Sequence, residues 1–316
     1  MMKILIAACA LVAITVTLSV AEEDMPRISV KKPFAEHGND ASANTSPQIL
    51  FNGGPVLVGT VPLYVIYYGT SFPSKTQDIV NQFLNGLSNR PQFNVNTSYC
   101  EQQTTACPTG AVGVSGLVSF PITNKSGAAN VFPDSGSQGG QLSTKDITKV
   151  LSHAFQNGLT IDEGAIYILI TSPAVKVSGF CTSFCAYHTH STAIVSGRNI
   201  HYAVVPEPGS GCTVCDGNFA VYKEKVTPTG DAGADEMIDS IMHELSETVT
   251  DPDLNAWYTS NGAENGDLCD YNYGTAPYTF KAPNGATANA SWNGYNYLIQ
   301  QIWKNGPTPQ SCASAP

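Results

Sequence analysis

The first residues of this chain limit its fold most, because they decide whether its cysteines can form disulfides. Met1-Met2-Lys3 is followed by an apolar run from Ile4 to Val20 that ends at small residues. A basic start, an apolar middle and a small-residue end are typical of a secretory signal peptide. The run is short for a bilayer span, and three acidic residues follow it, which disfavours a membrane anchor. We predict that residues 1–21 are a signal peptide and that the mature chain is secreted, without a membrane span.

The remaining cysteines then predict a disulfide framework. Cys9 leaves with the signal peptide, and an even number of cysteines in a secreted chain favours pairing. Sequence proximity favours local loop closure, although about 105 connectivities are open to eight cysteines. A redox or zinc motif at Cys212 and Cys215 is the alternative. The predicted pairs are Cys100–Cys107, Cys181–Cys185, Cys212–Cys215 and Cys269–Cys312.

Composition limits the partners of the mature chain. The formal net charge is −10, and the few lysines and arginines are not clustered. Nucleic-acid binding and attraction to anionic membranes are therefore excluded as functions. Asparagine glycosylation is predicted if the host is eukaryotic, at sequons that begin at Asn44, Asn96, Asn124 and Asn289.

Hydrophobic periodicity predicts an α/β fold. Residues 22–48 are polar and are predicted to be a flexible tail, whereas residues 49–316 show no linker or repeat and form one domain. Helices are predicted after Pro73, after a cap at Ser143, and over residues 235–250. Strands are predicted at residues 61–68, 111–120, 165–171, 200–205 and 297–303. This order predicts a layered, parallel or mixed sheet with flanking helices.

The third predicted helix carries the segment His243-Glu244-Leu245-Ser246-Glu247. Helical spacing places His243 and Glu247 one turn apart on one face, where both reach a single cation. The segment resembles the metal helix of zincins with the second histidine replaced by glutamate. In zincins the residue at the position of Glu244 holds the attacking water, so the resemblance implies that Glu244 is catalytic. The alternative is an ordinary acidic surface helix.

A catalytic zinc site needs a third protein ligand. Asp251, Asp253, Glu264 and Asp267 follow the helix, and we favour Glu264, with Asp267 as an alternative ligand or as a partner of His243. One imidazole with two carboxylates is a hard donor set, so zinc is predicted and manganese or calcium remains an option.

His188 is the second candidate catalytic residue. It follows Cys181 and Cys185 closely and is predicted to line the active cleft and stabilise an oxyanion; the alternative is a small disulfide loop with surface histidines. His201 lies in a predicted strand and is interpreted as structural. The chain has no Gly-rich phosphate loop and no nucleophile elbow, so serine and cysteine hydrolases have no support.

Segments spread over residues 51–303 resemble the EXORDIUM/phosphate-induced protein family. They are Gly53–Leu57, Tyr64–Gly69, Gly179–Cys185 with His188, His243–Glu247, Asn255–Tyr258 and Gly266–Cys269. The resemblance implies a secreted protein of the apoplast or cell wall and maps the family's histidine and acidic positions onto His243, Glu244, Glu247, Glu264 and Asp267. The chain departs from plant members around Pro206-Glu207-Pro208-Gly209, so a partner-binding role of that region is not carried over.

Two functions follow from these observations. The first is a secreted zinc-dependent hydrolase, a peptidase, in which Glu244 deprotonates a water bound to the metal. The second is a non-catalytic extracellular signalling or wall-associated protein in which the same residues hold a structural ion. The partners implied are an extracellular peptide or a cell-wall component.

Overall fold

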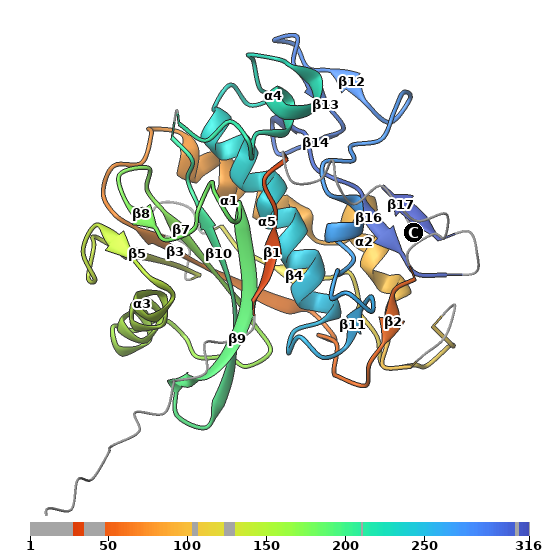
Figure 1. Cartoon of the computed structure of the whole chain (residues 1–316), viewed down its shortest axis with the longest axis horizontal. Helices are drawn as coiled ribbons and strands as arrows, with labels where there is room; N and C mark the ends of the chain where they lie inside the picture. Colours follow the sequence, from red (N-terminus) through yellow and green to blue (C-terminus); the bar gives the residue numbers. More distant parts are fainter. Residues whose placement is uncertain are drawn as a thin grey trace, which may run out of the picture.

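A mixed seven-stranded sheet forms the centre of the molecule (Figure 1). The computed structural model describes residues 28–34, 48–102, 107–122, 130–209, 211–306 and 310–315. The sheet runs in the order β1 (Ser29–Lys31), β9 (Ala186–Val195), β10 (Arg198–Pro206), β7 (Ile166–Thr171), β3 (Val61–Tyr68) and β4 (Val118–Ser119), with β5 (Val131–Asp134) also paired to β3. Strands β10, β7 and β3 are parallel neighbours, and β9 is antiparallel to both β10 and β1. The predicted layered α/β fold with a mixed sheet is confirmed.

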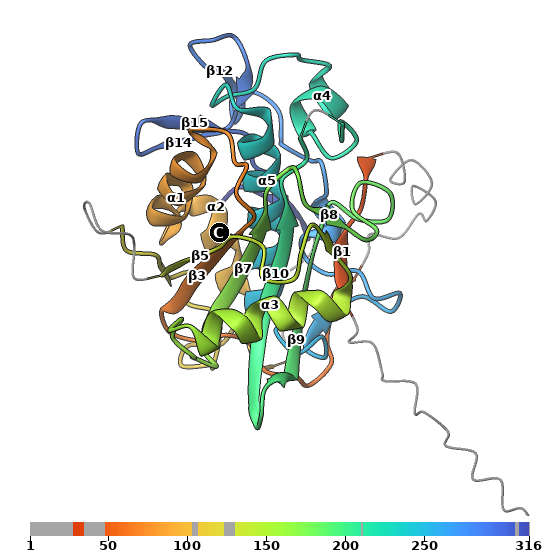
Figure 2. The same ribbon diagram turned by 90° about the vertical axis from the view of Figure 1, so that its left-hand side faces the viewer.

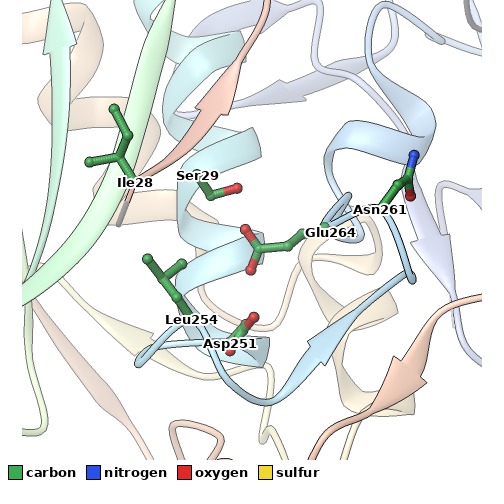
Figure 3. Close-up of a pocket in the computed structure, with 7 residues that line it drawn as sticks. Ile28, Ser29, Asp251, Leu254, Asn261 and Glu264 are labelled. Atoms are coloured by element: carbon green, nitrogen blue, oxygen red, sulfur yellow. The ribbon is translucent and has the colours of Figure 1, made fainter. Parts of the chain in front are cut away.

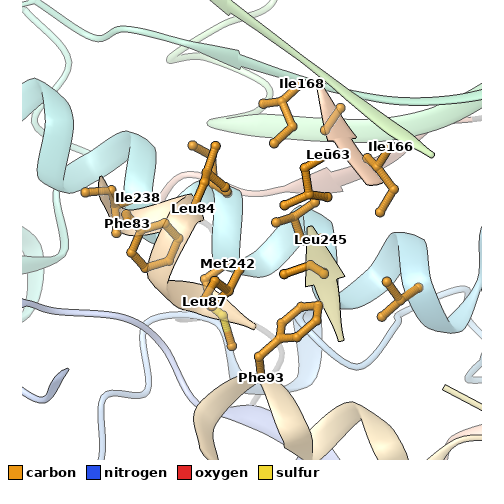
Figure 4. Packing of buried hydrophobic residues seen from close by; sticks show 14 of the residues in the cluster. Leu63, Phe83, Leu84, Leu87, Phe93, Ile166, Ile168, Ile238, Met242 and Leu245 are labelled. Atoms are coloured by element: carbon orange, nitrogen blue, oxygen red, sulfur yellow. The ribbon is translucent and has the colours of Figure 1, made fainter. Parts of the chain in front are cut away.

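Helices cover both faces of this sheet, which explains the continuous apolar runs of its central strands. Helix α3 (Thr144–Gln156) lies on one face, and α1 (Thr76–Leu87) and α5 (Ala232–Thr250) lie on the other (Figure 2). Alternate residues of β3 therefore enter different cores: Leu63 packs towards α5, and Ile66 packs on the α3 side. Figure 4 shows Leu63 among side chains of α1 and α5.

Helix α5 is buried along almost its whole length. Every residue from Gly233 to Thr250 is buried, because β9 and β10 cover one side and α1 and the C-terminal loops cover the others. The Asp231 carboxylate accepts a hydrogen bond from the Ala234 N–H and begins the helix, which ends before Pro252. The alternative of an acidic surface helix is therefore wrong.

Shorter elements complete the chain. After α5 the chain forms short strands, most of them paired in small hairpins, and β15 contacts α1. The remaining elements are β2 (Leu50–Phe51), α2 (Pro91–Asn94), η2 (Val95–Ser98), β6 (Gln141–Leu142), β8 (Lys176–Val177), α4 (Gly217–Tyr222), β11 (Trp257–Tyr258), η3 (Asp267–Cys269), β12 (Phe280–Lys281), β13 (Thr287–Ala288), β14 (Ala290–Trp292), β15 (Tyr295–Tyr297), β16 (Ile302–Lys304) and β17 (Ser311–Ala313).

The strand predictions are confirmed at β3, β7 and β10 and are wrong elsewhere. Of residues 111–120 only Val118–Ser119 forms a strand, and residues 297–303 are divided between the end of β15 and the start of β16.

The predicted flexible tail is wrong at Ser29–Lys31, which pairs with β9. The signal peptide lies outside the described residues. The predicted cap at Ser143 is confirmed as a reciprocal capping box with Asp146.

Four disulfides are present, and two of them differ from the prediction. Cys100–Cys107 and Cys269–Cys312 are confirmed, whereas Cys181 bonds Cys212 and Cys185 bonds Cys215. Because β9 and β10 are antiparallel, the loop before β9 lies next to the loop after β10. Each cysteine of the first loop therefore bonds a cysteine of the second loop, and not its neighbour in the same loop. Cys212 and Cys215 are thus not a redox or zinc motif.

Two predicted glycosylation sequons lie in packed regions. The Asn96 side chain is fully buried and donates a hydrogen bond to Ser246 Oγ, and the Asn289 side chain donates to the Tyr273 and Ile299 carbonyls. Asn44 and Asn124 lie outside the described residues. No helix of the described ranges is long and apolar enough to cross a membrane.

The packing of α1 gives a test of the fold. A Cβ on Gly86 would lie 2.2 Å from Cδ1 of Trp292, whose indole packs on Phe83. Gly→Ala within a helix usually stabilises a protein by up to about 1 kcal/mol. We predict that Gly86→Ala instead lowers the free energy of unfolding by about 1–3 kcal/mol, because Trp292 must move. Urea denaturation measures this, and Gln77→Ala, on the exposed side of α1, serves as the control; stabilisation by Gly86→Ala would contradict the packing.

A buried carboxyl in the first turn of α5 gives a pH-dependent test. Burial raises the pKa of Asp235 to about 7, although Thr229 donates hydrogen bonds to its Oδ2. The folded state therefore binds the proton of Asp235 more tightly than the unfolded state does. The stabilisation that comes from this bound proton is lost as the pH rises from about 4 through 7. We predict that Asp235→Asn, which mimics the protonated acid, leaves the Tm nearly unchanged at pH 3, where the carboxyl is protonated in both the folded and the unfolded state. At pH 8 it should stabilise the protein by about 4 kcal/mol, because each unit of pKa shift corresponds to about 1.4 kcal/mol. An equal difference at both pH values, measured by calorimetry, would contradict this assignment.

Candidate metal centre

The side chains predicted as site residues converge between α5 and β9. His243, Glu244 and Glu247 come from α5, and His188 comes from β9. Glu264 lies in the loop that leads into η3, and Asp267 is the first residue of η3. Five of these side chains are at most 2% exposed, and the Asp267 side chain is 18% exposed. The structure therefore brings all six together in one buried cluster.

The Glu247 carboxylate lies at the centre of the cluster. Its Oε1 is 3.0 Å from His243 Nε2, its Oε2 is 3.5 Å from His188 Nε2, and the Asp267 N–H donates to Oε1 at 3.0 Å. Burial alone would raise the pKa of Glu247, but the two histidines and the Asp267 amide hold it below its ordinary value. Glu247 is thus the ionised member that both histidines share.

His243 is oriented by an amide on the opposite side of its ring. Its Nδ1 is 3.1 Å from Gln300 Oε1, while the Gln300 amide nitrogen donates to the Gly266 carbonyl at 2.8 Å. The proton on Nδ1 therefore points to Gln300, and Nε2 faces Glu247 and Asp267, whose Oδ1 is 3.7 Å away. Burial lowers the pKa of His243, but the charge of Glu247 outweighs it and raises the pKa to about 10. A proton on Nε2 balances Glu247 here, and a metal ion would replace that proton.

His188 forms a second contact in the cluster. It is fully buried in β9, so the alternative of surface histidines in a disulfide loop is wrong. Its Nε2 is 3.0 Å from Glu264 Oε2. Burial lowers the pKa of His188 to about 4 and, together with Glu247, raises that of Glu264 well above its ordinary value. Burial therefore disfavours the charged form of both partners.

Glu244 is the least compensated group of the cluster. Its side chain is fully buried, and within the described ranges neither carboxylate oxygen has a hydrogen-bond partner. Burial raises the pKa of Glu244 well above its ordinary value. A buried carboxyl without a partner is costly, and such exceptions in folded proteins call for an explanation.

Within this cluster, two overlapping groups of described side chains have metal-ligand spacing. They are His188, Glu244 and Glu247, and His243, Glu247 and Asp267, with the ligand atoms of each group within 4.8 Å of one another. Glu247 belongs to both groups. Asp267, predicted as the alternative to Glu264, completes the group with His243, while Glu264 reaches the cluster through His188. Metal binding itself stays a prediction.

The other acids considered from the sequence have different roles. Asp251 Oδ1 accepts hydrogen bonds from the Asn255 and Ala256 N–H groups after the helix. Asp253 lies 2.9 Å from His201 in a separate, largely buried pair. Sequence reasoning missed three groups beside His243, because no motif or periodicity marks them: Lys31, Asp270 and Gln300.

A pocket of about 230 Å³ reaches the edge of the cluster at Glu264. Figure 3 shows the Glu264 carboxylate pointing into it, opposite Ser29 and above Asp251. Ile28, Ser29, Asp251, Leu254, Asn261, Gly262 and Glu264 line it. The pocket admits water and small groups, but it is too small for a folded substrate.

Comparison with known proteins identifies the family. The family model described as the phosphate-induced protein 1 conserved region matches residues 49–315. The chain belongs to the EXORDIUM/phosphate-induced protein 1 family. EXORDIUM-like 3 of Arabidopsis thaliana is 29% identical over 82% of this chain and 81% of its own length. EXORDIUM-like 5 of the same plant is 30% identical over 83% and 76%.

A relative from a second plant extends the comparison. PHOSPHATE-INDUCED 1 of Nicotiana tabacum is 26% identical over 84% of this chain and 87% of its own length. No solved structure matches the chain significantly. The predicted EXORDIUM resemblance is therefore confirmed, whereas the likeness of α5 to a zincin metal helix stays a prediction.

Two glutamates one turn apart on α5 give a stability test of this EXORDIUM-family site. In a chelator at pH 7, we predict that Glu247→Gln lowers the free energy of unfolding by about 3 kcal/mol or more, because it breaks a buried ion pair. Glu244→Gln should leave it unchanged or raise it, because no described partner is lost and a costly ionisable group is removed. Calorimetry of both variants checks this, and similar losses in both would show that Glu244 is paired.

Proposed function

We propose that this EXORDIUM-family protein is secreted and holds a divalent cation, zinc in the first place, between α5 and β9. The observation that carries the proposal is the shared Glu247 carboxylate, which His243 and His188 approach at 3.0 and 3.5 Å in a cluster with three further carboxyl groups. Two imidazoles cannot balance four clustered carboxyl groups without added protons, and a divalent cation would offset two of the four negative charges.

The donor set fits a cation of this kind. His243 Nε2 and the carboxylates of Glu247 and Asp267 would hold the ion, and Gln300 would fix the tautomer of His243 from behind. His188, Glu244 and Glu264 lie next to these ligands. They offer alternative ligands for the ion or hydrogen-bond partners for the residues that hold it. With one imidazole and two carboxylates, manganese or calcium would also bind more readily than at a two-histidine site.

The depth of the cluster favours a structural role for the ion. His243, Glu244, Glu247 and His188 are all 0% exposed, and the adjoining pocket of about 230 Å³ is narrow. A hydrolase must admit a substrate to within contact of its reacting water. The best-supported function is therefore a non-catalytic extracellular or wall-associated protein stabilised by a metal ion, with an extracellular peptide or a cell-wall component as its partner.

A metal-dependent hydrolase, a peptidase, is the second candidate function. It is favoured by Glu244, whose unpartnered carboxyl lies beside His243 and Glu247, and by the pocket that reaches Glu264. The bound ion would supply an activated water. Glu244 would accept its proton, and His188 would orient Glu264 at the end of the pocket.

The location outside the cell rests on separate observations. Four disulfides join all eight cysteines that follow the predicted signal peptide, and such frameworks persist in oxidising compartments. We propose secretion to the apoplast or cell wall on this basis and on the predicted signal peptide.

Elemental analysis of the purified secreted protein tests the metal site. We predict about one zinc ion per chain in the wild type and its loss in His243→Ala and Glu247→Ala. His153→Ala, at a partly exposed histidine of α3 on the opposite face of the sheet, should retain the ion and serves as the control. A folded wild-type protein without stoichiometric metal, after incubation with zinc, manganese or calcium, would refute the proposal.

Glu244→Gln separates the two functions. If the ion is structural, this variant should keep the metal and behave as the wild type against a peptide library. If the protein is a hydrolase, Glu244→Gln should keep the metal and lose turnover by about 100-fold or more. Turnover by the wild type that survives the substitution would remove Glu244 from the mechanism.

A further inference from the structure

Strand β1 is an addition to the edge of the sheet. It comes from residues 28–34, which precede the region matched by the family model, and it pairs antiparallel with β9 so that Ser29 faces His188 and Lys31 faces Ala186. Figure 1 shows β1 between β9 and α5, and β1 contacts both. The other strands of the sheet, the helices and the four disulfides come from other parts of the chain.

The side chain of Lys31 enters a pocket that other segments build. Its ammonium lies 3.1 Å from Asp239 of α5, 2.6 Å from Asp270 after η3, and 2.6 Å from Gln300 Oε1. The Tyr271 ring lies 4.6 Å from the same nitrogen. The Lys31 side chain is 0% exposed, so the pocket encloses one cation of lysine length between two carboxylates.

Apart from the Lys31 side chain, the segment is held mainly by hydrogen bonds of its own backbone. The Cys185 N–H donates to the Lys31 carbonyl at 2.7 Å, Tyr271 Oη donates to the Lys32 carbonyl at 3.0 Å, and the Phe34 N–H donates to the Val214 carbonyl at 2.9 Å. The Phe34 ring meets Tyr271 edge to face at 5.2 Å. Backbone pairing to a sheet edge with one anchoring side chain in a pocket is the pattern of peptide recognition by strand addition.

We propose that this groove is a binding site for an extended, lysine-bearing peptide segment, and that residues 28–34 fill it in cis. The groove consists of the β9 edge from Cys185 to His188 and the pocket formed by Asp239, Asp270, Tyr271 and Gln300. Lysine at the position of Lys31 is the specificity determinant, because a neutral side chain there removes the ammonium that lies between the Asp239 and Asp270 carboxylates.

The segment in the groove also covers the candidate metal centre. Ile28 and Ser29 form one wall of the pocket at Glu264, as Figure 3 shows, and Ser29 pairs with the strand position of His188. Departure of the segment would therefore open the cluster to solvent. This consequence rests on the proposed metal site, whereas the peptide site does not.

Binding of a labelled peptide to the full-length chain tests the proposal. The probe is a capped peptide of residues 28–34, Ile-Ser-Val-Lys-Lys-Pro-Phe, measured by fluorescence anisotropy in a chelator, so that the result does not depend on a metal ion. The tethered segment competes at an effective concentration on the order of millimolar, so the wild type should bind the probe weakly. Lys31→Met weakens the tethered segment and should increase affinity for the probe by about 100-fold or more.

Lys32 provides the matched control. Its side chain makes no ion pair in the described part of the chain, so Lys32→Met should bind the probe as weakly as the wild type. The same peptide with the Lys31→Met change should bind the Lys31→Met protein about 100-fold more weakly than the probe. Absence of probe binding to folded Lys31→Met, or equal binding of the two peptides, would overturn the proposal.

A second arm covers a Lys31→Met chain that does not fold. A protease site placed between residues 34 and 48 of the wild type allows the tether to be cut after folding. The probe should then displace the cleaved segment, and the peptide with the Lys31→Met change should not. Retention of the cleaved segment in excess probe, or displacement by both peptides alike, would overturn the proposal.

Discussion

The burial of charged side chains along α5 is the constraint on which the rest of the structure depends. Asp235, Glu236, Asp239, His243, Glu244 and Glu247 lie on one helix, and all are buried. Leaving such groups without partners costs far more than a typical hydrogen bond contributes, so the surrounding segments must provide opposite charges, donors or protons. Asp239 receives Lys31 and the Tyr273 hydroxyl, and Glu247 receives the two histidines and a backbone amide. The irregular C-terminal loops are needed for this compensation as much as for covering apolar surface.

The framework of the fold could be predicted from sequence because its signals are local. Strands β3 and β7 are continuous apolar runs, and α1 and α3 carry stripes at helical spacing with recognisable starts. Strand β9 was missed because histidine, threonine and serine occupy much of it, and its burial comes from partners distant in the chain. Strand β1 has only three residues and includes a buried lysine, which no propensity favours in a core.

The candidate site could be predicted only in part, for the same reason. Spacing within one helix related His243 to Glu247, and the need for a third ligand pointed to Glu264 and Asp267 among the acids that follow the helix. Two disulfides were mispaired because sequence proximity ignores the antiparallel packing of β9 on β10, which brings Cys181 to Cys212. Lys31, Asp270 and Gln300 are separated from His243 by long stretches of chain, and only the folded structure brings them to it.

Gln300 joins the candidate metal centre to the segment that covers it. Its Oε1 accepts hydrogen bonds from Lys31 Nζ at 2.6 Å and from His243 Nδ1 at 3.1 Å. A carbonyl oxygen has two lone pairs, so one amide oxygen satisfies both donors and fixes which nitrogen of His243 faces Glu247. If Lys31 leaves, Gln300 loses a cationic donor and Asp239 and Asp270 lose their counter-charge, while His243 remains as the nearest cation. The charge on His243 and the position of β1 are therefore coupled through Gln300 and Asp270, and departure of Lys31 from the groove would change the electrostatic environment of the cluster.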